Sequence, residues 1–105
     1  GGAQWRDSRV LAKVSDRAVI SLALAPDESI LAVGRMRADP VVIDARSGAL
    51  LAELRTPTPR SAEALAFDPL GTRIASFSFN GYYYPSTGRV DVFDAVTYER
   101  SIGWT

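Results

Sequence analysis

The order of large, small and polar residues along the chain predicts short β-strands. In the segment 20–24, leucines alternate with Ser21 and Ala23, and further on Leu65 and Phe67 alternate with alanines. A period of two places successive side chains on opposite faces of a strand. A strand with one face in water would alternate apolar with charged residues, so we expect both faces of these strands to be covered.

The chain contains an internal repeat. The segment 20–32 aligns without gaps on the segment 63–75, at an offset of 43 residues. A second pair, 41–45 and 91–95, matches at an offset of 50 residues. The second copy therefore has seven additional residues between its second and third strands. Recurrence at such a period predicts two structural units of the same architecture.

Each unit is expected to contain four strands joined by turns. The predicted strands are 19–24, 30–34, 41–44 and 50–54 in the first unit, and 62–67, 73–79, 89–93 and 100–104 in the second. Every Pro falls between these strands, where it does not remove ladder hydrogen bonds, and most Gly residues also lie outside the strands. The last strand of each unit is more polar, with Glu53 and Arg100, which is typical of a solvent-exposed rim.

The two units resemble β-propeller repeats of the WD40 kind. The motifs that carry the resemblance are SLALAPDESILAVG with VVIDARSGALLAEL, and ALAFDPLGTRIASFS with GRVDVFDAVTYERSIGW. The motif VVIDARSGALLAEL is equally similar to repeats of bacterial surface-layer and YVTN-type propellers. The chain departs from WD40 repeats because Ile43-Asp44 and Phe93-Asp94 stand where that family has Trp-Asp, and because it contains no His.

The resemblance implies an all-β fold, a β-propeller segment of two four-stranded antiparallel blades plus one extra outer strand. The expected parts are a lead-in at 1–9, an outer strand of a preceding or closing blade at 10–14, blade 1 at 17–54, and blade 2 at 61–105 with an insertion at 80–88. The outer strand is expected because 10–14 matches 50–54. The alternative is a small β-sandwich of eight or nine strands. The recurring offsets and turns favour the propeller.

A propeller typically needs about four to eight blades, because each blade covers its faces only with neighbouring blades. Two blades would leave two apolar faces without cover, which is a risk of aggregation. The expected partners are therefore other blades: the remainder of a longer chain, another subunit, or further copies of this chain.

Charge and composition exclude several partners and cofactors. The 12 basic and 12 acidic residues cancel, so neither nucleic acid nor an anionic membrane is an expected partner. Without His and Cys the chain has no Ser-His or Cys-His nucleophile, no typical zinc site and no haem ligand. It has no glycine-rich phosphate loop either, and we expect no cofactor. No apolar run approaches the roughly 20 residues of a membrane span, and no signal peptide is evident. The compartment stays open, with the cytoplasm favoured.

Four aspartates lie at turns or strand ends of the repeat and are interpreted as equivalent: Asp27, Asp44, Asp68 and Asp94. An Asp at such a position commonly accepts backbone N–H bonds and shapes the turn. No Asp-x-Asp-x-Asp calcium loop occurs. We therefore expect a structural role for these carboxylates.

The insertion contains the candidate binding residues Tyr82, Tyr83 and Tyr84. Tyr is enriched in interface hot spots, and the resemblance implies that this loop shares a face with Arg35 and Arg37 of the first unit. Such a patch would suit an acidic peptide or a phosphate group. The alternative is that the tyrosines extend a longer hairpin and that the two arginines are solvated loop charges.

The sequence therefore predicts a non-catalytic scaffold segment that mediates protein–protein interaction or assembly within a larger ring. The alternative is a part of a propeller-containing enzyme, a dehydrogenase or a peptidase, whose catalytic groups lie outside this chain.

Overall fold

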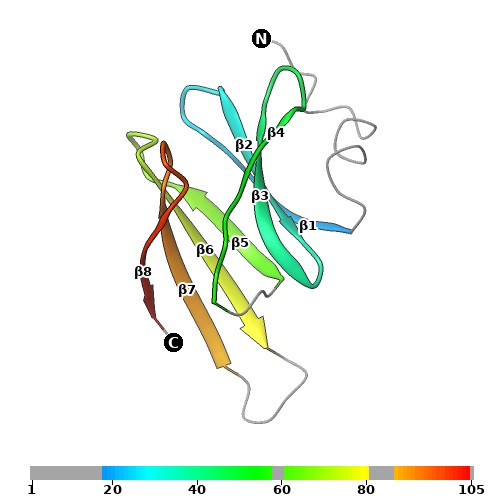
Figure 1. Cartoon of the computed structure of the whole chain (residues 1–105), viewed down its shortest axis with the longest axis vertical. Coiled ribbons are helices and arrows are strands. Elements are labelled where there is room, and N and C mark those ends of the chain that lie inside the picture. Colours follow the sequence, from blue (N-terminus) through cyan, green and yellow to red (C-terminus); the bar gives the residue numbers. More distant parts are fainter. Residues whose placement is uncertain (1–17, 58–60, 81–86, 105) are drawn as a thin grey trace.

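The computed structural model describes residues 18–57, 61–80 and 87–104, which form eight strands in two sheets (Figure 1). The first sheet contains β1 (Val19–Leu24), β2 (Ile30–Arg35), β3 (Ala38–Asp44) and β4 (Leu50–Glu53). The second sheet contains β5 (Ala62–Phe67), β6 (Arg73–Asn80), β7 (Thr87–Asp94) and β8 (Arg100–Trp104). The predicted pair of four-stranded antiparallel units is confirmed. The predicted lead-in at 1–9 and outer strand at 10–14 lie outside the described residues.

Both sheets are antiparallel meanders with strands in sequence order. The register between their first two strands is the same: Leu22 faces Val33 in the first sheet, and Leu65 faces Ser76 in the second. Each residue of the second pair is 43 positions after its counterpart. The repeat found in the sequence is thus a repeat of backbone pairing.

Strand boundaries differ from the prediction in β2, β3, β4, β6 and β7, and the largest shift is at the start of β3. Strand β3 begins at Ala38, so Pro40 lies inside a strand, although we expected Pro only between strands. The pairing of β2 with β3 shifts register between Val33 and Arg35, and the buried Pro40 accepts a hydrogen bond from the Leu54 N–H at 2.8 Å. A register shift relieves Pro of the ladder bond that it cannot donate, which a strand pattern alone does not reveal.

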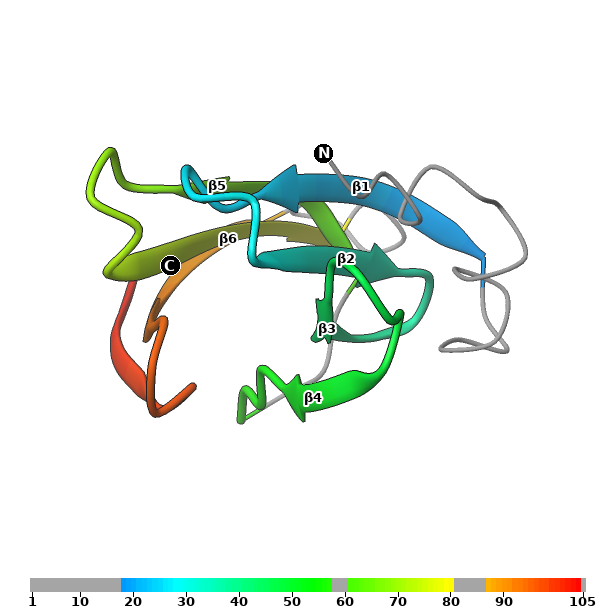
Figure 2. The ribbon, with the colours of Figure 1, turned by 90° about the horizontal axis from the view of Figure 1, so that it is seen from above.

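The sheets pack against each other around β5, which lies beside β1 in Figure 2 and contacts β1, β2 and β3. In the core between them, large side chains of the second sheet pack on small side chains of the first, and Ile30 and Leu54 of the first unit join the same cluster. The large side chains are Leu65, Phe67, Ile74 and Phe93, and the small ones are Ala23, Ala32 and Val42. Ile74 and Phe93 are fully buried, and each such side chain contributes about 1.5–3 kcal/mol of hydrophobic free energy.

The closest approach of the two sheets requires a glycine. The Ser21 hydroxyl donates a hydrogen bond to the Ala62 carbonyl at 2.6 Å. A Cβ on Gly34 would overlap the Ser21 hydroxyl and lie 2.7 Å from the same carbonyl oxygen. Only a residue without a side chain allows β5 to pack this closely on β1 and β2.

The centre of the outer face of the first sheet is buried, whereas Leu22, which lies on the same side by its pairing with Val33, is 44% exposed. Leu31, Val33, Val41 and Ile43 form a cluster in which no side chain is more than 2% exposed. We expected an uncovered outer face on each sheet. For the first sheet this prediction was wrong at the centre of the face, where these four residues are buried, but not at Leu22 in the edge strand.

Candidate functional site

The principal candidate surface is the side of the second sheet that faces away from the first sheet, which we call the open face. It is formed by Ala64, Ala66, Ala75, Phe77, Phe79, Val90, Val92, Ile102 and Trp104, which share one side of the sheet by strand pairing. Its four largest side chains, those of Phe77, Phe79, Ile102 and Trp104, are 40–54% exposed. An apolar face of this kind is typical of an interaction surface.

The centre of the open face repeats a face that is already covered elsewhere in the molecule. By the repeat offsets, Ala66, Ala75 and Val92 correspond to Ala23, Ala32 and Val42, which are the same residue types. The second sheet covers that first set of small residues with its large side chains. The open face therefore has the composition of the receiving side of an interface between sheets.

The end of the open face near the β6–β7 hairpin differs from the first sheet. Phe77 occupies the position of Gly34, and its ring lies over Gly88, where an added Cβ would be 2.9 Å from Phe77 Cε2. Strands β6 and β7 pair without a register shift as far as Asn80 and Thr87. The β6–β7 hairpin is thus longer than the β2–β3 hairpin of the first sheet. The alternative interpretation, in which the tyrosines extend this hairpin, concerns residues outside those described.

A buried ionic cluster lies on the other side of the second sheet. The Asp91 carboxylate, with no exposed surface, accepts a hydrogen bond from Arg89 Nε at 2.8 Å and one from Arg100 Nε at 2.7 Å. A Cβ on Gly103 would collide with the Arg100 guanidinium, so this glycine gives Arg100 its path to Asp91. The repeat pattern did not predict this cluster. The available signal was a charged residue at the repeat position where the first sheet has Val41.

The last turns of the two sheets are capped identically. Asp44 Oδ1 accepts the N–H groups of Arg46 at 2.9 Å and Ser47 at 2.8 Å, and Asp94 Oδ1 accepts those of Val96 and Thr97. In both turns the backbone hydrogen bond from the third residue, Ser47 or Thr97, is the main cause that lowers the pKa of the aspartate. This confirms the predicted structural role for these two residues.

The first turns are not capped identically, so the interpretation of all four aspartates as equivalent was wrong. Asp27 accepts hydrogen bonds from the Ser29 N–H at 3.0 Å and the Ser29 hydroxyl at 2.6 Å. Asp68 bonds Thr72 and Arg73 instead, and by the offset of 43 residues it corresponds to Ala25. Hydroxyl hydrogen bonds, from Ser29 and Thr72 respectively, are the main cause of the lowered pKa of both aspartates. Asp27 and Asp68 therefore accept hydrogen bonds from equivalent backbone N–H groups, those of Ser29 and Thr72, although the two aspartates are not at equivalent positions.

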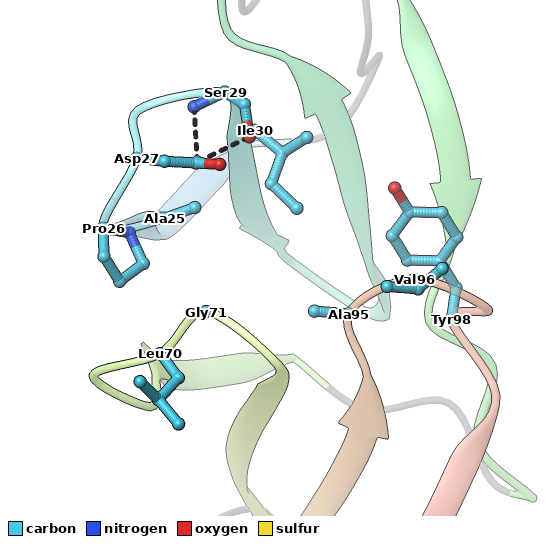
Figure 3. A pocket seen from close by; sticks show the side chains of 10 residues that line it. All are labelled: Ala25, Pro26, Asp27, Ser29, Ile30, Leu70, Gly71, Ala95, Val96 and Tyr98. Atoms are coloured by element: carbon cyan, nitrogen blue, oxygen red, sulfur yellow. Dashed lines mark hydrogen bonds between the residues drawn. The ribbon is translucent and has the colours of Figure 1, made fainter.

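A cleft of about 400 Å³ opens between the sheets at the turn end of the molecule, opposite the β6–β7 hairpin (Figure 3). The β1–β2 turn contributes Asp27 and Ser29 to its lining, and the second sheet contributes Leu70, Val96 and Tyr98. We refer to it as the turn cleft. The sequence did not predict it, because it lies between turns of different units.

The structure places the two predicted arginines at the β2–β3 turn. The Arg35 side chain is only 13% exposed, donates a hydrogen bond from Nε to the Asp39 carbonyl at 2.9 Å and lies 3.6 Å from a Glu53 carboxylate oxygen. Arg37 is exposed, and its backbone N–H donates to the Ser61 hydroxyl at 2.6 Å. An acidic partner would have to compete with Asp39 and Glu53 for Arg35.

The predicted binding residues Tyr82, Tyr83 and Tyr84 lie outside the described residues. Their role as a partner-binding loop stays a prediction. Among the residues that the structure does describe, no group of three or more His, Cys, Asp or Glu side chains is placed to hold a metal ion. The same residues include no helix long and apolar enough to cross a membrane.

Comparison with solved structures identifies the class of fold. The chain is similar to the WD40 repeats of RRP9, with a TM-score of 0.69 and 15% identity over 87% of this chain. It is also similar to hydrazine synthase of Kuenenia stuttgartiensis, with a TM-score of 0.68 and 16% identity over 81% of this chain. Two four-stranded antiparallel meanders with such neighbours define a fold of the β-propeller type, as the sequence predicted.

The likeness is one of fold alone, because the identities are low. No family model matches the sequence, and no curated protein is significantly similar to it. The chain spans 27% of the RRP9 chain and 23% of the hydrazine synthase chain, which is about a quarter of each solved chain.

Proposed function

We propose that this chain supplies two consecutive blades to a larger β-propeller and acts there as a non-catalytic scaffold segment, with its open face covered by a further blade. The observation that carries the proposal is the identity of two sets of small residues. The set on the open face is Ala66, Ala75 and Val92, and the set already covered by the second sheet is Ala23, Ala32 and Val42. Because the open face has the same small residues as the covered side of the first sheet, large side chains of a further blade can pack on it in the same way.

Two further observations support the proposal. Large apolar side chains such as Ile102 and Trp104 are about half exposed in the isolated chain, and their exposure leaves hydrophobic free energy of roughly 25 cal/mol per Å² unrealised. The chain also corresponds to about a quarter of the solved chains that it resembles. A propeller supplies the missing cover through its remaining blades.

The finer assignment to divergent WD40-like repeats is part of the proposal. It rests on the Asp that ends the third strand of each sheet, Asp44 and Asp94, and on the Asp-Pro-Leu-Gly turn that begins at Asp68. These residues close turns in this chain without any His. We therefore assign their role to turn capping rather than to a hydrogen-bond network with His.

The proposal can be tested by the self-association of the 105-residue chain. In the isolated chain, cover for the open face must come from another copy, so we expect sedimentation velocity to show association at micromolar concentrations. Ala66→Lys, which places a charge in the centre of the face, should abolish it. The matched control is Ala49→Lys, at an exposed turn position outside the open face, and it should leave association unchanged.

A second variant separates an interface from a surface that is merely sticky. Ala75→Leu adds apolar area but removes the space that a packed sheet needs, so it should weaken association. Stronger association of this variant, or a wild-type chain that stays monomeric at high concentration, would contradict the proposal.

A further inference from the structure

The turn cleft has one apolar wall, and this wall is specific to the second sheet. Leu70 and Val96 border it and are 85% and 79% exposed. The residues at the equivalent positions of the first sheet are polar, Asp27 and Arg46. Turn capping allows the exchange at Leu70, because Asp27 caps the first turn whereas Asp68 caps the equivalent turn of the second sheet. It does not require an apolar residue at Leu70 or at Val96. The exchange creates an apolar surface at the place where the two sheets leave a gap.

Tyr98 completes this wall. Its backbone is left-handed, with φ 65°, whereas the equivalent residue of the first sheet is Gly48, with φ 76°. A side chain in this conformation costs free energy that glycine avoids. The Tyr98 ring packs at the edge of the core between the sheets and borders the cleft with Val96 (Figure 3). The apolar wall therefore includes Tyr98, which is held against the core, as well as the exposed Leu70 and Val96.

The opposite wall is anionic. The Asp27 carboxylate borders the cleft, and both hydrogen bonds that it accepts from Ser29 reach Oδ1, so Ser29 does not occupy Oδ2. These hydrogen bonds lower the pKa of Asp27, which keeps it charged at neutral pH. The turns around the cleft make its electrostatic potential more negative. They contain the carboxylates Asp27, Glu28, Asp44, Asp68, Asp94 and Glu99 against the guanidinium groups Arg46, Arg73 and Arg100.

We propose that the turn cleft binds a basic segment of a partner protein, in which an aliphatic side chain contacts Leu70 and Val96 while a neighbouring Lys or Arg pairs with Asp27. The excess of carboxylates at this end attracts a basic chain over a longer range. A peptide segment fits better than a small amine, because an open cleft encloses too little of a small molecule to hold it by apolar contact. This inference is independent of what covers the open face.

The experiment uses the 105-residue chain and a defined probe. An acetylated, amidated peptide containing the run Lys-Leu-Ser-Lys is titrated into the isotope-labelled chain, and amide chemical shifts are followed by NMR. We expect saturable shifts confined to 25–30, 70–71 and 95–98. The same peptide with Glu in place of Lys should produce no such shifts.

Variants of the two walls should weaken binding separately. Asp27→Asn keeps an acceptor for the Ser29 turn but removes the charge, and Leu70→Ser removes the exposed apolar contact. Each should raise the peptide Kd about fivefold or more, which corresponds to a contact of modest strength at an exposed site. The matched controls are Glu63→Gln, which removes one negative charge at an exposed position of β5 outside the turns around the cleft, and Met36→Ser, an exposed apolar residue at the opposite end. Both should leave the Kd unchanged.

Several results would overturn the inference. These are no saturable shift with the basic peptide, equal binding of the acidic peptide, shifts centred outside the cleft, or a Kd that Asp27→Asn and Leu70→Ser do not change. Binding of n-butylamine as strong as that of the peptide would identify a small-amine site instead. Sedimentation of Asp27→Asn and Leu70→Ser should match the wild type, which keeps a failure here separate from a failure of the open face as an assembly surface.

Discussion

The two sheets share one repeat but differ in how they are stabilised. The first sheet is buried at its centre on both sides, and its residues from Leu31 to Val33 are at most 1% exposed. The second sheet is covered on one side only, and on that side it buries the charged Asp91. A repeat pattern thus sets strand pairing and register, whereas the neighbours of each sheet decide what its faces contain.

The largest expected effect comes from making the second sheet resemble the first at Asp91. Asp91→Val introduces the residue that the first sheet has at this position, Val41, but it leaves Arg89 and Arg100 without their shared carboxylate. Removing one partner from a buried ion pair costs about 3–5 kcal/mol. Urea unfolding followed by circular dichroism measures the free energy of unfolding.

The control for this prediction is the triple variant Arg89→Met, Asp91→Val, Arg100→Leu. It replaces the whole cluster by apolar side chains and should regain most of the lost stability, because apolar replacements of buried ion pairs are often neutral. A loss below about 1 kcal/mol for Asp91→Val alone would mean that the cluster behaves like an exposed ion pair.

The next largest effect on stability is expected at the repeat position occupied by Gly34 in the first sheet and by Phe77 in the second. Gly34→Ala inserts a methyl group against the Ser21 hydroxyl and the Ala62 carbonyl, so we expect a loss of about 1–3 kcal/mol. Phe77, the equivalent residue of the second sheet, is 40% exposed on the open face. Phe77→Ala should therefore cost only about 1 kcal/mol. Thermal unfolding of both variants tests the pair, and equal losses would show that the open face is as tightly packed as the core.

A smaller effect is expected at the left-handed position of the first turn. Glu28 and Gly71 are equivalent and have φ of 62° and 72°. Gly71→Ala should destabilise the chain by about 1 kcal/mol, and Glu28→Gly should stabilise it by up to about 1 kcal/mol. The urea midpoints of the two variants are measured, and they should shift in opposite directions from the wild-type value. A loss of stability in Glu28→Gly would mean that the Glu28 side chain makes a stabilising contact.

The smallest effect on stability is expected from lowering the pH. The pKa values of Asp27, Asp44, Asp68 and Asp94 are lowered by hydrogen bonds in the folded chain. Their contribution to stability is therefore complete above the unfolded pKa of about 4 and is lost as the pH falls through the lower folded values. Melting temperatures measured from pH 6 to pH 2 should therefore decrease once the pH is below about 4. Asp94→Asn should show a smaller fall than the wild type, and an unchanged profile would contradict the role of this cap.

Several features of the molecule were predictable because they depend on local pattern. The period of two and the turns predicted all eight strands, and the offsets of 43 and 50 residues predicted their common register. The caps made by Asp44 and Asp94 followed from the same repeat. Pro40 inside β3 was not predictable, because a register shift depends on the pairing of two strands.

The candidate sites were less predictable than the fold. The sequence pointed to the tyrosines of the insertion and to Arg35, whereas the structure shows Arg35 engaged by Asp39 and Glu53. It did not point to the turn cleft, because a contact between separate units leaves no periodic signal in either unit. The Asp91 cluster lies within the second unit, and its signal was a charged residue where the first unit has an apolar one, but only strand pairing brings Arg100 to it.

Alternation and turn chemistry fix the strands, their order and the division into large and small faces, because both act over a few residues along the chain. Which of these faces are covered depends on how the folded sheets pack. Leu31 and Ile43 became buried, whereas Phe77 and Trp104 remained exposed, although all four are large and apolar. Burial is a property of what lies opposite a side chain, and that is set by the packing of whole sheets rather than by the pattern within one.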